Sequence, residues 1–159
     1  ANAFGQNTSN QIISDNHLSQ EISIISKFKN LFLILLGNVV QKFGNELEKQ
    51  QQILLSLSDI LIEIYFSESA LYRTLKNIDN QGIDSQTTQE NMVQFYVFEA
   101  YNIIHKSARE IILSISDGEE QEQLLKILNE KCSYNRHPNV IGLKTKIANK
   151  FIEENSYFI

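Results

Sequence analysis

Residues 46–78 read ELEKQQQILLSLSDILIEIYFSESALYRTLKNI, with apolar side chains recurring every three or four positions. Seven apolar residues and one acid form the main stripe: Leu54, Leu57, Leu61, Ile64, Glu68, Leu71, Leu75 and Ile78. A second row widens this face: Ile53, Ile60 and Tyr65. The spacing predicts one amphipathic helix about 50 Å long at 1.5 Å per residue. A face this wide requires partner helices of similar length.

The rest of the chain supplies those partners. Apolar residues at helical spacing predict long helices over about 18–43 and 88–116, and shorter ones over about 119–132 and from about Asn139 onward. The predicted stripe of the first long helix is Ile25, Phe28, Phe32, Leu35, Val39 and Phe43. That of the other long helix is Val93, Val97, Ala100, Ile104, Ala108, Ile111 and Ile115. The last helix is expected to use Ile141, Leu143, Ile147, Phe151 and Ile152. Turn signals separate these helices at Gly44, near Gly82 and at Gly118, and before Pro138. The predicted fold class is all-α, an up-and-down helical bundle of three long helices plus two shorter C-terminal helices.

Length and composition indicate one folded domain. The chain has 159 residues, of which 42% are hydrophobic and 21% charged, as in ordinary globular proteins. Residues 1–17 are polar and aperiodic, so we interpret them as a flexible tail or linker, with residues 1–3 resembling a scar left by a cloning vector. Residues 18–159 are then a single helical-bundle domain, and the apolar end 157–159 is expected to pack on it.

The charge and the apolar runs argue against several classes of protein. The formal net charge is −5, which argues against binding of nucleic acid. The longest apolar run, Leu31 to Leu36, has six residues, whereas a membrane span needs about 20. We therefore expect neither a membrane span nor a signal peptide. A single cysteine, Cys132, fits a reducing compartment, and we predict a cytoplasmic protein.

Glu68 is the one acid in the predicted seam. A buried carboxyl there could be a general base or a metal ligand, but buried carboxylates are usually paired, so an ion pair is favoured. The candidate partners lie nearby or across the next long helix: Arg73, His105, Lys106 and Arg109. For Glu99 the same two interpretations apply, a functional acid or metal ligand on one hand and an ion pair on the other. The sequence holds no Glu-x-x-His, so Glu68, Glu99 and His105 do not match a bundle metal site.

The other reactive side chains are scattered. His17, His105 and His137 do not match zinc-ligand spacing, and Cys132 has no CxxC partner. No GxSxG, P-loop or GxGxxG motif is present. We therefore predict no catalytic, cofactor-binding or metal-binding residue. The basic cluster near the C-terminus is interpreted as a solvated helix face rather than an anion-binding surface: Arg136, Lys144, Lys146 and Lys150.

Several runs, taken in order, resemble a known family. They are Val39–Lys42, Leu47–Gln51, Ser58–Tyr65 leading into Glu68–Lys76, Lys146–Lys150 and Asn155–Tyr157. Their order and spacing are similar to the C-terminal helical extension of acyl-CoA dehydrogenases of the very-long-chain type, especially bacterial ones. The resemblance covers nearly the whole chain from about residue 20.

This resemblance implies a parent flavoenzyme of fatty-acid β-oxidation. In such enzymes an upstream core binds FAD, and a glutamate removes the α-proton of an acyl-CoA while the flavin takes the β-hydride. The resemblance implies that this chain is non-catalytic and has no cofactor of its own. Its partners would be its own catalytic core and a second copy in a homodimer. The acidic balance makes a membrane role unlikely for this chain.

A second class of function stays open from the sequence alone. The chain could be a free-standing helical module that binds another protein through an exposed apolar stripe. The predicted third helix favours this reading because aromatic residues surround its beginning: Phe95, Tyr96, Phe98 and Tyr101.

Overall fold

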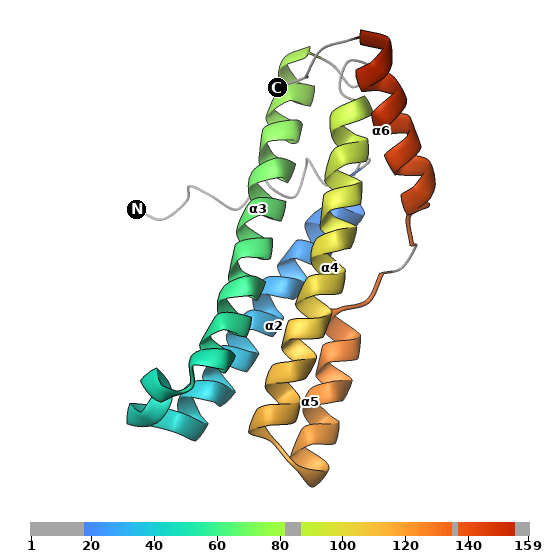
Figure 1. The fold of residues 1–159 in the computed structure, drawn as a ribbon. Coiled ribbons are helices and arrows are strands. Elements are labelled where there is room, and N and C mark those ends of the chain that lie inside the picture. The colour runs from blue at the N-terminus through green and yellow to red at the C-terminus, as the bar shows by residue number, and fades with distance from the viewer. Residues whose placement is uncertain (1–17, 82–86, 135–136, 155–159) are drawn as a thin grey trace, which may run out of the picture.

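The protein is a helical bundle (Figure 1). The computed structural model describes residues 18–81, 87–134 and 137–154, and no strand occurs among them. The elements in chain order are α2 (Ser19–Phe43), a 3-10 helix η1 (Gly44–Lys49), α3 (Gln51–Gln81), α4 (Thr87–Ile115), α5 (Gly118–Lys131) and α6 (Val140–Glu154). The predicted all-α fold, with three long and two shorter helices, is confirmed.

The three long helices lie side by side, and the two short ones complete the bundle. Figure 1 shows α5 beside the C-terminal half of α4 and α6 beside its N-terminal half. The two short helices therefore form a fourth column with a break in its middle. Pro138 lies in that break, where its ring disfavours helix for the preceding residue, so that α6 begins only at Val140.

The core runs along α4, where the sequence predicted every position correctly. Its seven stripe residues are all buried: Val93, Val97, Ala100, Ile104, Ala108, Ile111 and Ile115. The two alanines let α4 approach its neighbours closely. On α2, the buried residues Ile25, Phe28, Leu35 and Val39 confirm the predicted stripe.

The buried face of α3 agrees with the predicted one at five residues but has a different centre: Ile53, Leu57, Ile60, Ile64 and Leu71 are buried as predicted. The Leu61 and Tyr65 side chains, both expected inside, are 50% and 65% exposed. The buried row is instead Ile53, Leu57, Ile60, Ile64, Ser67, Leu71 and Thr74. This row holds two hydroxyl residues, whereas the neighbouring face carries large apolar side chains. Apolar content alone therefore favoured the wrong centre for the seam.

The start of α3 was also predicted too early. The segment Gly44–Lys49 forms the 3-10 helix η1, and the long helix begins at Gln51 rather than at Glu46. Gly44 has a φ of 49°, which favours glycine and ends α2 as predicted. The chain then reverses within η1, and no residue of η1 is buried.

The inward face of α6 is narrower than predicted. Leu143 is buried, but Ile141 and Ile152, both expected inside, are 80% and 76% exposed. Only one row of α6 contacts α4, because this helix packs on the outside of the bundle. The expected tail 1–17 and the apolar end 157–159 lie outside the described residues.

One described stretch, Ser19–Lys49, is long and apolar enough to cross a membrane by length and composition. A core helix of a soluble protein meets the same criteria. Phe28, Leu31 and Leu35 of this stretch are at most 1% exposed and pack in the bundle core. The expectation of no membrane span stays a prediction.

Candidate functional site

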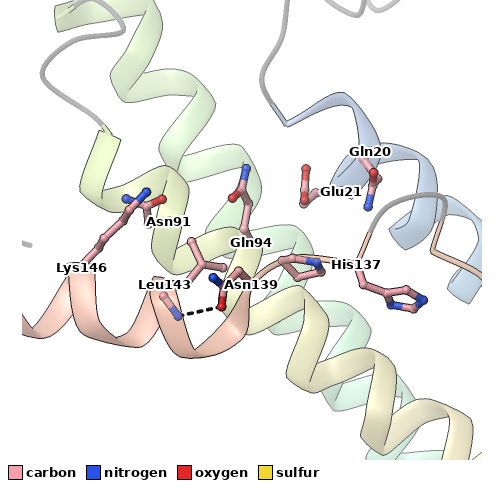
Figure 2. A pocket seen from close by; sticks show the side chains of 10 residues that line it. Gln20, Glu21, Asn91, Gln94, His137, Asn139, Leu143 and Lys146 are labelled. Atoms are coloured by element: carbon pink, nitrogen blue, oxygen red, sulfur yellow. Dashed lines mark hydrogen bonds between the residues drawn. The ribbon is translucent and has the colours of Figure 1, made fainter.

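A polar hollow opens where the fourth column is broken (Figure 2). Its volume is about 550 Å³, within the usual range for ligand pockets. The first turns of α2 and α4 and the beginning of α6 form its walls. The lining residues are Gln20, Glu21, Asn91, Gln94, His137, Pro138, Asn139, Gly142, Leu143 and Lys146. Most of them carry amide or charged groups, so the hollow suits a polar molecule.

Glu21 is the buried acid of this hollow. It is only 5% exposed, and its Oε2 atom accepts no hydrogen bond. Burial raises the pKa of the Glu21 carboxyl above its ordinary value, an effect opposed by a backbone hydrogen bond and reinforced by the charge of Glu90. Glu90 of α4 is itself 7% exposed. Two carboxyl groups thus lie close together at one end of the hollow.

An aromatic cluster next to the hollow includes Tyr134 and His137, two described residues that lie between α5 and α6 in the chain. The Tyr134 ring centroid lies 5.3 Å from that of Tyr101 and 5.7 Å from that of Phe98. The His137 ring packs on the same group, 5.9 Å from Tyr134. Burial, followed by the charge of Glu21, raises the pKa of the Tyr134 phenol. Tyr134 and Glu21 are therefore neighbours, although they come from opposite ends of the chain.

The contact made by Glu68 confirms the favoured ion pair but with an unpredicted partner. Lys29 of α2 donates to Glu68 Oε1, and the side chains are 45% and 28% exposed. Glu68 therefore lies at the α2–α3 boundary rather than in the seam. Arg73 points elsewhere, lining a separate groove between α3 and α4.

The remaining candidates on α4 do not assemble into a site. Glu99 is half-buried, and no ion pair joins it to any described residue. His105 packs its ring 6.0 Å from that of Tyr101. Lys106 pairs with Glu110 one turn on, at 3.9 Å. Among the described residues, no three His, Cys, Asp or Glu side chains form a metal-binding group.

Cys132 and the C-terminal lysines have local roles. Cys132 is 4% exposed, and burial raises the pKa of its thiol to about 12. Such a thiol stays protonated and unreactive at neutral pH. Lys144 lies over the Phe95 ring, 4.9 Å from its centroid, and Lys150 pairs with Glu154. Lys146 lines the hollow, a role that the sequence did not indicate. His17 and Arg136 lie outside the described residues.

The outer face of α3 carries large apolar side chains that the bundle leaves uncovered. Six of them are between 48% and 65% exposed: Leu55, Leu61, Ile62, Tyr65, Phe66 and Tyr72. Leu55, Ile62 and Phe66 follow one another at spacings of seven and four, so they form one row pointing away from the core. We call these six residues the α3 outer face. Contiguous apolar surface of this kind usually marks an interface.

Three comparisons with known proteins relate this chain to one family. A family model described as "Acyl-CoA dehydrogenase, C-terminal domain" matches residues 27–130. A probable acyl-CoA dehydrogenase of Bacillus subtilis is 30% identical over 142 residues, covering 89% of this chain and 24% of the relative. The crystal structure of an acyl-CoA dehydrogenase complexed with FAD from Bacillus anthracis superposes with a TM-score of 0.87 at 28% identity, covering 95% of this chain and 26% of that one.

The fold defines an all-α helical bundle domain. The family match covers well over half of the chain, so the chain belongs to the acyl-CoA dehydrogenase family. It corresponds to the C-terminal domain of such an enzyme. It spans about a quarter of the length of the relatives that it matches.

The described residues of the hollow do not form a glycine-rich cradle of the kind that holds a dinucleotide pyrophosphate at a helix N-terminus in Rossmann folds. Gly142 is the one glycine of the hollow, and a Cβ there would lie 2.9 Å from the Asn139 side-chain nitrogen. Asn139 Oδ1 already accepts a hydrogen bond from the Gly142 amide, at 3.0 Å. The first turn of α6 is therefore closed by its own cap.

Proposed function

We propose that this chain is the non-catalytic C-terminal domain of an FAD-dependent acyl-CoA dehydrogenase that acts in fatty-acid β-oxidation. The observation that carries the proposal is the share of each relative with which the chain aligns. The chain aligns with a quarter of each relative, one of which is complexed with FAD, while its own described residues offer no cradle for that cofactor. The flavin and the acyl-CoA would be bound by the remaining part of the polypeptide.

The role of the domain would be architectural. The α3 outer face would pack against the catalytic core of the same polypeptide and support self-association into a homodimer. This assignment is supported by the chemistry of the face, which is apolar and aromatic, as interface centres are. The Tyr65 and Phe66 rings contact each other edge to face with centroids 5.6 Å apart, which gives the face a rigid aromatic anchor. We expect the assembled enzyme to be cytoplasmic.

The size of the native polypeptide tests the parent enzyme. An antibody raised against this chain should detect, in the source cells, a band about four times heavier than 18.3 kDa. The protein captured by that antibody should show a flavin absorption spectrum and reduce an electron-accepting dye only when acyl-CoA is added. A flavin-free band near 18.3 kDa would overturn the proposal and favour a free-standing interaction module.

A pair of surface variants tests the α3 outer face. Phe66→Ser removes an aromatic side chain that is 53% exposed, and Leu33→Ser removes an apolar side chain of α2 that is 63% exposed. In the full-length polypeptide, sedimentation velocity should show that Phe66→Ser shifts the protein toward monomer or loosens the core. Leu33→Ser should sediment as the wild type does. Equal behaviour of the two variants would refute this use of the face.

A further inference from the structure

The polar hollow beside Glu21 has opposite charges at its two ends. Figure 2 shows Glu21 and Gln20 of α2 on one side, Gln94 of α4 in the middle, and Lys146 of α6 near Asn91 on the other side. Within the part of the chain that the structure describes, no salt bridge engages Lys146. Figure 2 places Asn139, which directly precedes α6, between Gln94 and His137, so α6 begins between the two ends of the hollow.

The Glu21 end is built for a donor. A carboxyl group that is 95% buried ordinarily has hydrogen-bond partners for both oxygens, but Oε2 has none. The Tyr134 hydroxyl nearby is also buried without a partner. Glu90 adds negative charge on the α4 side. An ammonium group next to Glu21 would satisfy the orphaned oxygen and relieve the repulsion between the two acids.

The Lys146 end suits an anion of a single charge. The single ammonium group of Lys146 matches a carboxylate. A phosphate would require more donors, and the Gly142 amide is already engaged by Asn139. The amides of Asn91 and Gln94 lie between the two ends, where they can donate or accept.

We propose that this hollow binds a small zwitterion, an amino carboxylic acid whose ammonium group contacts Glu21 and whose carboxylate contacts Lys146. The hollow is roomy enough for an amino acid of several carbons. The inference stands on the lining residues alone and does not depend on the proposed role in an acyl-CoA dehydrogenase. It assigns to this domain a ligand site of its own.

Isothermal titration calorimetry of the 159-residue chain tests the proposal. The probes are 4-aminobutyrate and 6-aminohexanoate, with n-butylamine and butyrate as controls that each carry one of the two charges. At least one amino acid should bind saturably, and at least about tenfold more tightly than either control. Absence of saturable binding by both amino acids, or equal binding of n-butylamine, would overturn the proposal.

Three variants locate the binding. Glu21→Gln keeps the shape of the side chain and removes its charge, and Lys146→Met does the same at the other end. Each should weaken binding of the amino acid at least about tenfold, and circular dichroism should show that each is folded. Lys144→Met is the matched control on α6, because Lys144 contacts the Phe95 ring instead of the hollow. Unchanged affinity in Glu21→Gln would refute the site, even where that variant is more stable than the wild type.

Discussion

Ser67 offers a sharp test of the packing of α3. Its side chain is 0% exposed in the seam, and its hydroxyl makes no hydrogen bond. A buried hydroxyl without a partner costs about 1–3 kcal/mol, and alanine is favoured over serine in a helix by about 0.5 kcal/mol. The single-atom cavity left in Ser67→Ala would cost about 0.5 kcal/mol. We therefore expect Ser67→Ala to stabilise the protein by about 1–3 kcal/mol.

Urea unfolding followed by circular dichroism measures this gain, which corresponds to a rise in Tm of about 3–9 °C. Ser58→Ala in the same helix is the control for helix propensity, because Ser58 is exposed. Ser116→Ala is the opposite case, since that buried hydroxyl donates to the Ile112 carbonyl at 2.7 Å, and its loss should destabilise by about 0.5–1.5 kcal/mol. If Ser67→Ala raises the free energy of unfolding by no more than Ser58→Ala does, Ser67 does not lie in the seam.

Four further predictions follow from burial and charge. Phe28→Ala, at a fully buried position, should cost about 3–5 kcal/mol in urea unfolding. Lys29→Ala should cost under about 1 kcal/mol, and less at 1 M salt, because its ion pair with Glu68 is partly exposed. Native Cys132 should react with a thiol reagent at pH 8 only as fast as the protein unfolds, since its thiol pKa is about 12. Burial raises the pKa of Glu21, so between the unfolded and the folded pKa its carboxyl binds more protons in the folded state than in the unfolded chain. The free energy of unfolding should therefore fall as the pH rises from about 4.5 toward the folded pKa, and this fall should be smaller in Glu21→Gln.

The sequence predicted the helices well because their periodicity and turn residues agree. Along α4 only one face is continuously apolar or small, so every predicted core residue is buried. Along α3 two faces compete. Leu61 and Tyr65, both large and apolar, point outward, whereas Ser67 and Thr74 pack inside. Periodicity identifies an apolar face but does not distinguish one that packs in the core from one suited to a partner.

The sequence did not predict the hollow, and the reason is different. Glu21 is a first-turn acid, which ordinarily indicates only a favourable interaction with the helix dipole. The groups that interact electrostatically with it, Tyr134 and Glu90, are more than 60 residues away in the chain. The available signal was Pro138, which predicted the break between the short helices but not which residues would line it. Lys146 was accordingly interpreted as one of several solvated cations.

The 3-10 segment η1 has a practical consequence for protein engineering. It joins two helices of the bundle by six residues, none of them buried, and only Leu47 packs partly against the core. Its hydrogen bonds are local, as in the pairing of the Gln50 amide with the Leu47 carbonyl. Added residues between Glu48 and Lys49 would extend into solvent without separating α2 from α3. A peptide tag or fluorescent label could be introduced there to follow the domain in an assembled enzyme.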